Sequence, residues 1–313
     1  MKQFLAVLAL MTSVIYAEEY PWSHTIPADI AVPALQPDQV LDEKPCDWRP
    51  VVTPIFAPIA KECKTAREAV LRIAANMGSS TGCYYSTERR IHNMNALEAL
   101  AEKKISCTGQ SILLVCALRS VDIPARAVGV HTWNHIEGNH TWVEAWIDGA
   151  WHMIEFNESD FNTPWVMENI GMLNTVHVFQ RIYAANPMGN TTWWPEAFAK
   201  EKNLPNFSAE DVTERYMNLS RKWHSKHGLP EDFQRILIDL QPRADDAPTV
   251  EIVNESGRVV SAGKLPSSQD DMRYCTRLTV PRQGAHYLRI QGDEERSRII
   301  TTPAPVQLFR IRL

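Results

Sequence analysis

The sequence predicts an α+β fold, with helices in the first part, an antiparallel hairpin near the middle and a small all-β module at the end. Residues 111–121 are dense in apolar side chains and contain no Gly or Pro, which predicts a largely buried helix. Two β-rich runs, at 141–147 and 150–156, flank the turn signal Asp148-Gly149. From residue 249 onward, short β-rich runs alternate with polar turns, as in a β-sandwich.

The composition divides the chain into five expected segments. They are a signal peptide at residues 1–17, a Pro-rich arm at 18–62, a main globular unit at 63–240, a linker at 241–248 and an accessory β-module at 249–313. The arm is expected to lie extended on the surface, because Pro disfavours helix interiors. Within the main unit, helices are expected at 65–76, at 95–103, from Ser208 towards His227, and over a short stretch ending near Leu240.

Cys107 stands in polar surroundings just before the buried helix, which is expected to end ahead of Ile123-Pro124. The partial positive charge at a helix N-terminus stabilises a thiolate and lowers the pKa of a thiol from about 8.5. Cys116, further along the apolar run, has the surroundings of an ordinary core thiol. Cys107 is therefore a candidate nucleophile, with a buried structural thiol as the alternative.

The hairpin supplies possible partners for this thiol. Its turn at Asp148-Gly149 sets a register in which His140, Glu155 and Asn157 share one face. Glu155 lies diagonal to His140, where a carboxylate would orient the imidazole. Asn157 lies directly opposite, so a Cys-His-Asn arrangement stays open, and Glu158 would fit only where the strand has already broken. The structural alternative is a histidine packed beside tryptophans and a solvated carboxylate.

Several short motifs follow one another between the candidate nucleophile and the end of the hairpin. They are Cys107 itself, Leu118-Arg119, Ile123-Pro124-Ala125-Arg126, His140-Thr-Trp-Val-Glu144 and Trp151-His-Met-Ile-Glu155. In this order and spacing, roughly residues 63–200 resemble the transglutaminase-like (papain-like cysteine enzyme) superfamily, and most closely a bacterial secreted branch. Two positions depart from the family pattern, which usually has Asp where this chain has Glu155 and Gly where it has Asp122.

The resemblance implies a papain/transglutaminase-like core, with the nucleophile helix packed on an antiparallel sheet. It also implies that Cys107 is the nucleophile, that His140 is the general base and acid, and that Glu155 orients His140. The activity implied is that of a cysteine peptidase or amidase, or of a protein-glutamine acyltransferase, acting on peptides or proteins. Cell-wall peptides, host proteins and dietary proteins are all open as substrates. No cofactor is implied, and the scattered histidines have no metal-ligand spacing.

The N-terminus predicts export. Lys2, an apolar run at residues 4–14 and Ala17 ahead of two glutamates have the order of a cleavable signal peptide with a cut after Ala17. The run is shorter than the about 20 residues of a membrane-spanning helix. The mature chain is therefore expected to be secreted or periplasmic, with no membrane span. The full chain has a formal charge of −5, and removal of Lys2 with the signal peptide makes it −6, which argues against a nucleic-acid partner.

Six cysteines in an exported chain suggest disulfides. Cys107 must stay free to react, and Cys116 is expected in the core. Four others remain for pairing: Cys46, Cys63, Cys83 and Cys275. Three full pairings are possible, among which a Cys46–Cys63 bridge would join the N-terminal arm to the first helix.

A second hypothesis from a different class is a non-catalytic secreted binding or scaffold protein that keeps the fold. The Glu155 departure favours this alternative, whereas the presence of both Cys107 and His140 favours the enzyme. The two hypotheses differ in thiol reactivity, because a scaffold has no need for a cysteine of low pKa.

Overall fold

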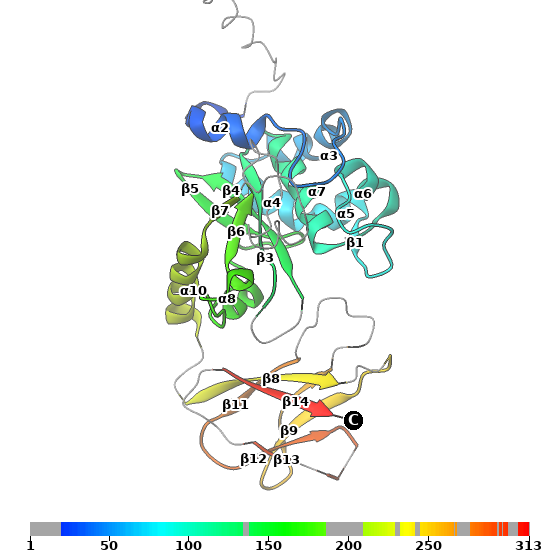
Figure 1. The fold of residues 1–313 in the computed structure, drawn as a ribbon, viewed down its shortest axis with the longest axis vertical. Helices are drawn as coiled ribbons and strands as arrows, with labels where there is room; N and C mark the ends of the chain where they lie inside the picture. The colour runs from blue at the N-terminus through cyan, green and yellow to red at the C-terminus, as the bar shows by residue number, and fades with distance from the viewer. Residues whose placement is uncertain are drawn as a thin grey trace, which may run out of the picture.

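The computed structural model describes residues 20–133, 138–185, 209–228, 232–241, 245–265, 267, 276–292, 294–295, 297–299 and 306–312. It confirms the α+β fold class. In Figure 1, the helices of the first part surround one central helix, the middle strands form a sheet beside it, and the C-terminal strands gather at the other end of the molecule.

The first part of the chain is mainly helical. Its helices are α2 (Ala28–Leu35), α3 (Arg49–Lys61), α4 (Ala66–Ala75), α5 (Met77–Thr81), α6 (Ala96–Glu102) and α7 (Cys107–Arg119), with a 3-10 turn at Ser23–Thr25. Two short strands, β1 (Tyr84–Tyr85) and β2 (Lys104–Ile105), form a parallel pair. All residues of α7 except Gln110 are buried, so α7 is the central helix that the apolar run predicts. The two predicted amphipathic helices are confirmed as α4 and α6.

The Pro-rich segment is not an extended arm, and this prediction was wrong. Its second half forms α3, in which Val52 and Phe56 are buried in the main core. Pro54 and Pro58 lie inside the same helix but on its exposed side. Each proline removes one backbone hydrogen bond, and burial of the opposite apolar face offsets that loss. Trp48, just ahead of α3, is also fully buried.

The five-stranded antiparallel sheet has the order β5-β4-β3-β6-β7. Its strands are β3 (Ala125–Val130), β4 (His140–Ile147), β5 (Ala150–Ile154), β6 (Ile182–Ala185) and β7 (Ala209–Asp211). In the β4–β5 hairpin, Ile147 pairs with Ala150 and Glu144 pairs with Met153, which confirms the register predicted from the Asp148-Gly149 turn. One face of the sheet joins the core around α7, and the other face packs against two further helices.

Those two helices are α8 (Pro164–Ile170) and α10 (Thr213–His227). A second 3-10 turn lies at Val178–Gln180. The helix expected from Ser208 begins later, because the backbone first pairs as β7, and Asp211 Oδ1 then accepts a hydrogen bond from Thr213 N at 3.0 Å. Ser208 itself lies outside the described residues.

The C-terminal strands form two sheets around their own apolar core. The strands are β8 (Phe233–Gln241), β9 (Thr249–Asn254), β10 (Val259–Lys264), β11 (Thr276–Pro281), β12 (His286–Ile290), β13 (Ser297–Ile299) and β14 (Val306–Arg312). The short helix expected near Leu240 is wrong. That stretch is β8, which pairs with β11 and β14, and alternate residues such as Ile236 and Ile238 enter the core.

The Cys46–Cys63 disulfide is also wrong, because Cys46, Cys63 and Cys83 are free thiols. The thirteen-residue helix α3 separates Cys46 from Cys63. At 1.5 Å per residue it is about 20 Å long, far more than a disulfide can bridge. Cys275 lies outside the described residues. In the part of the chain that the structure describes, no helix is long and apolar enough to cross a membrane.

Candidate active site

Cys107 is the first residue of α7 and is only 7% exposed. Ser106 caps the helix by accepting a hydrogen bond from Gly109 N at 2.9 Å. The cap fixes the direction of the first helical turn, whose N–H groups lack partners one turn earlier in the helix. The thiol therefore lies at the positive end of the helix, as the sequence predicts.

The structure brings His140 and Glu155 into direct contact. His140 is the first residue of β4, and Glu155 directly follows β5. His140 Nε2 lies 2.6 Å from Glu155 Oε1. The other ring nitrogen, Nδ1, is buried and has no hydrogen-bond partner of standard geometry among the described residues. Nδ1 is therefore the nitrogen left for Cys107, whose interaction with His140 is strong enough to change the pKa of both groups.

The electrostatics of the three groups favour a thiolate–imidazolium pair. Burial opposes charge on Cys107, but hydrogen bonding to His140 and the charge of that ring outweigh it, so the pKa of the thiol lies below its ordinary value. Burial also opposes charge on His140. The negative charges of Glu155 and Cys107 reverse that effect and raise the pKa of His140 to about 9.

The other two candidates for the third position have different partners. Asn157 has a left-handed backbone, and its Oδ1 accepts a hydrogen bond from Gly78 N at 2.7 Å. Asn157 therefore fastens the end of the hairpin to α5. Glu158 N donates to Glu155 O in a turn, so the strand has broken by this point. Burial, followed by repulsion from Glu155, raises the pKa of Glu158.

Two hydroxyl groups connect the nucleophile helix to the histidine strand. Thr108 Oγ1 and Thr141 Oγ1 are 3.0 Å apart, and Ser111 Oγ donates to Thr141 O at 2.9 Å. Both contacts involve the residue directly after His140. They therefore fix the relative position of Cys107 and His140. The sequence analysis did not predict this connection, although Thr108 and Ser111 beside the candidate nucleophile were the signal that could have indicated it.

Aromatic side chains surround the imidazole. The ring of Trp165, in α8, meets the ring of His140 edge-on with centroids 4.8 Å apart. Trp142 and Trp133 lie at 5.9 Å and 6.4 Å from the same ring. The sequence pointed to tryptophans near His140 on the strand, but not to Trp165, which comes from a separate helix.

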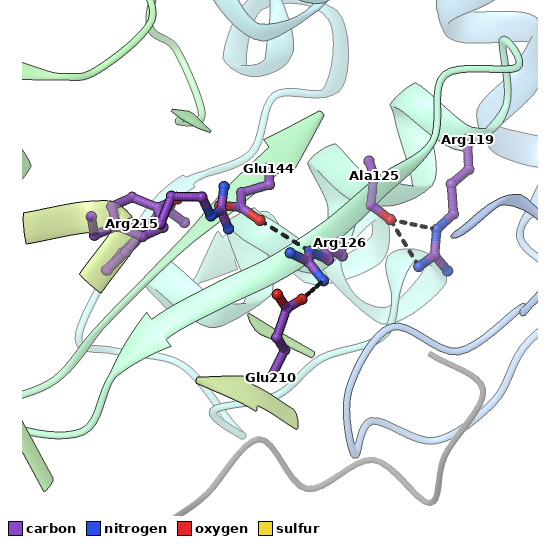
Figure 2. A network of polar contacts seen from close by, with 8 residues as sticks. Arg119, Ala125, Arg126, Glu144, Glu210 and Arg215 are labelled. Atoms are coloured by element: carbon purple, nitrogen blue, oxygen red, sulfur yellow. Dashed lines mark hydrogen bonds and ion pairs between the residues drawn. The ribbon is translucent and has the colours of Figure 1, made fainter. Parts of the chain in front are cut away.

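The motif residues Arg119 and Arg126 are structural in this protein, as Figure 2 shows. Arg119 is fully buried at the end of α7 and donates to Ala125 O from two of its nitrogens, at 3.1 Å and 3.0 Å. It also donates to Pro37 O and Gln39 O, at 3.0 Å and 3.1 Å. Burial lowers the pKa of Arg119 to about 10, so the group remains charged at neutral pH. It thus joins α7, β3 and the N-terminal segment.

Glu144 is fully buried and contacts two arginines (Figure 2). Its cross-strand neighbour Arg126 donates to it from Nε at 3.0 Å, and Arg215 Nη2 from α10 lies 2.5 Å away. Arg126 also contacts Glu210 at 2.7 Å and lies over the ring of Trp151. This network connects β3, β4, β7 and α10, and so fixes the strand that carries His140.

The structure also explains Asp122, which occupies a position usually held by Gly in the family pattern. Its φ of 59° is in the left-handed region, where Gly is favoured and Asp is tolerated. Its Oδ2 accepts a hydrogen bond from Ser23 Oγ at 2.8 Å, and the neighbouring Val121 O accepts one from Trp22 Nε1 at 2.9 Å. Asp122 therefore helps to hold the N-terminal segment against the end of α7.

Among the residues that the structure describes, no group of three or more His, Cys, Asp or Glu side chains has the geometry to hold a metal ion.

Parts of the chain are similar to known proteins. Residues 55–156 match the model of the transglutaminase-like superfamily. No curated protein matches the chain. Among solved structures, similarity is found to a candidate cysteine protease from Cytophaga hutchinsonii, at 19% identity, with a TM-score of 0.36 and coverage of 44% of this chain and 45% of that one. It is also found to red sea bream transglutaminase, at 10% identity, with a TM-score of 0.38 and coverage of 76% and 55%.

The chain thus spans about half the length of these two solved structures. The family match includes the start of α7, the whole β4–β5 hairpin and Glu155. The similarity to the transglutaminase-like superfamily is therefore shown for residues 55–156, the segment that carries the candidate triad.

Proposed function

We propose that this protein is a cysteine enzyme that cleaves or transfers acyl groups at amide bonds of peptides or proteins, with Cys107, His140 and Glu155 as its triad. The observation that carries the proposal is the 2.6 Å contact between His140 Nε2 and Glu155 Oε1, with Nδ1 left for the thiol at the start of α7. A buried histidine that served only for packing would gain nothing from a carboxylate that raises its pKa.

In the proposed reaction, the Cys107 thiolate attacks the amide carbonyl and forms a C–S bond. Backbone N–H groups at the start of α7 stabilise the oxyanion. His140 then gives its proton to the nitrogen of the leaving amine as the C–N bond breaks, and a thioester remains. Water attack on the thioester gives hydrolysis, and attack by a second amine gives transamidation. His140 takes the proton of the attacking group in either case, and Glu155 keeps the imidazole oriented.

Peptide hydrolysis is the preferred form of the activity and transamidation of glutamine side chains the second. The proposed setting is outside the cytoplasm, after removal of residues 1–17, which lie outside the described residues. Cell-wall peptides are one substrate class that this setting supplies. Analysis of the mature N-terminus by mass spectrometry tests the export step, and the expected first residue is Glu18.

The decisive test of the chemistry is alkylation of the purified protein with iodoacetamide from pH 4 to 9, with the labelled cysteine mapped by mass spectrometry. We expect Cys107 to react with an apparent pKa below that of a free thiol, about 8.5, and this low pKa to be lost in His140→Ala. The buried Cys116 is the internal control, because burial raises its pKa well above the ordinary value. An ordinary or inert Cys107 would leave the non-catalytic scaffold as the better description.

A further inference from the structure

The ring of Trp165 is held between the candidate active site and the C-terminal strands. It meets the ring of His140 edge-on at 4.8 Å and the ring of Trp133 at 5.6 Å. The guanidinium of Arg277, from β11, also lies 5.6 Å from the centroid of the Trp165 ring. Trp165 therefore links a residue of the C-terminal sheets to the imidazole.

Arg277 is itself held in place by a buried carboxylate. Glu168, one turn after Trp165 in α8, is only 7% exposed. Its Oε2 lies 3.2 Å from Arg277 Nε, and its Oε1 lies 3.0 Å from Arg235 Nη2 of β8. Two arginines of the C-terminal sheets thus share one carboxylate of α8. A carboxylate this buried depends on both partners for the stabilisation of its charge.

The pairing of β8 with β11 explains why both arginines point the same way. Arg277 pairs with Leu237, and Arg235 pairs with Thr279. Arg235 and Leu237 are two positions apart in one strand, so their side chains leave the same face of the sheet. The intervening Ile236 and its neighbours fill the core of the C-terminal sheets. The face opposite to that core is therefore the one that docks on α8.

From these contacts we infer that the C-terminal strands complete the candidate active site, with Arg277 as a positioning residue that holds Trp165 against His140. Among the described residues, the charged groups nearest the imidazole are Cys107 and Glu155, and Glu168 and Arg277 follow through their contacts with α8 and Trp165. The inference rests on the proposed function, since it concerns the same Cys107–His140 pair. Trp165 would keep water from the His140–Glu155 contact, which is stronger in a dry environment.

The test compares Arg277→Met with Arg235→Met as a matched control. Each change removes one guanidinium from Glu168. Of the two arginines, Arg277 is the one that also lies over the ring of Trp165 in the part of the chain that the structure describes. The probe is iodoacetate, an anion whose reaction with Cys107 is favoured while His140 is positively charged. The alkylation rate should therefore fall as pH rises through the pKa of His140. Thermal unfolding of each variant is recorded alongside.

We expect Arg277→Met to move this upper limb down by about one pH unit relative to Arg235→Met, which also removes one positive charge from Glu168. This shift is about a tenfold loss of the charged imidazole above the new midpoint. Arg235→Met should keep the wild-type profile. Trp165→Ala should reproduce the Arg277→Met profile, and Trp165→Phe, which keeps an aromatic edge, should restore most of the wild-type one. If Arg277→Met does not fold, the comparison of Trp165→Ala with Trp165→Phe tests the inference instead.

Equal shifts in both arginine variants, or none in either, would overturn the inference, as would Trp165→Ala with a wild-type profile. Failure of this inference can be told apart from failure of the proposed function. If the proposed function is wrong, wild-type Cys107 itself reacts as an ordinary thiol. If only the present inference fails, wild-type Cys107 keeps its low pKa and the Arg277→Met profile coincides with it.

Discussion

His140 Nε2 and Glu155 Oε1 are 2.6 Å apart although Glu155 lies just beyond the last residue of β5. The carboxylate is thus aimed by the end of the strand and by the turn that follows it, where Glu158 N donates to Glu155 O. This placement compensates for the additional methylene of Glu relative to the Asp that the family usually has. The contact has consequences for the charge of the imidazole that can be measured.

Glu155→Gln should lower the pKa of His140 from about 9 towards its ordinary value of 6.5, because a neutral amide no longer stabilises the imidazolium. The thiolate–imidazolium pair forms above the lowered pKa of Cys107 and is lost as pH rises through the pKa of His140. At pH 8 the variant should therefore react with iodoacetate at least about tenfold more slowly than the wild-type protein.

Asn157→Ala is the control for this change. It removes the hydrogen bond to Gly78 N and should reduce stability without moving the pH profile. If Asn157→Ala shifted the profile and Glu155→Gln did not, the third member of the triad would be misassigned.

Glu144→Ala should lower the free energy of unfolding by about 3–5 kcal/mol, because it removes the buried carboxylate that Arg126 and Arg215 share and leaves Arg126 with the exposed Glu210. Urea denaturation followed by circular dichroism gives the value. Glu88→Ala, which removes an exposed partner 2.6 Å from Lys104, is the comparison and should cost at most about 1 kcal/mol. Similar losses in the two variants would mean that the buried network is not a principal support of β4.

Arg119→Met should lower the stability of the protein more than the similar volumes of the Arg and Met side chains suggest. It leaves three buried or half-buried carbonyls, those of Ala125, Pro37 and Gln39, without their donor. Each unsatisfied group costs about 1–3 kcal/mol. Limited proteolysis should then cut first between residues 35 and 48, which are no longer held to α7. Arg72→Met, at an exposed ion pair with Glu62, should leave the digestion pattern unchanged.

The thiol state of the chain gives a further prediction. Denatured protein, kept from reductant throughout, should take up iodoacetamide at Cys46, Cys63 and Cys83. Peptide mapping by mass spectrometry provides the measurement. A peptide pair joined through Cys46 and Cys63 would contradict the placement of these residues at opposite ends of α3.

Local rules were enough for the elements that carry the candidate triad. The apolar run predicted α7 and its start at Cys107, and the Asp148-Gly149 turn predicted the hairpin register. Both depend on neighbours in sequence, either through helix periodicity or through a two-residue turn. The sequence left three residues open for the contact with His140, because the choice depends on where β5 ends.

The prediction failed where distant parts of the chain decide the outcome. Pro54 and Pro58 argued against a helix, yet four-residue spacing puts both on the exposed side while Phe56 is buried. Burial against the main core then outweighs the missing backbone hydrogen bonds. Arg277 and Trp165 are 112 positions apart in the sequence and belong to no common motif, so only the three-dimensional structure brings them together.

The buried guanidinium of Arg119 has a final consequence for how this protein can be divided. Similarity to the superfamily begins at residue 55, but Arg119 takes two of its acceptors from Pro37 and Gln39, and Trp48 is part of the same core. A recombinant fragment cut at the family boundary would expose apolar surface and leave a buried cation short of partners. The smallest part of the chain that folds by itself is therefore longer than the segment that matches the family model, and expression should start at or before Tyr20.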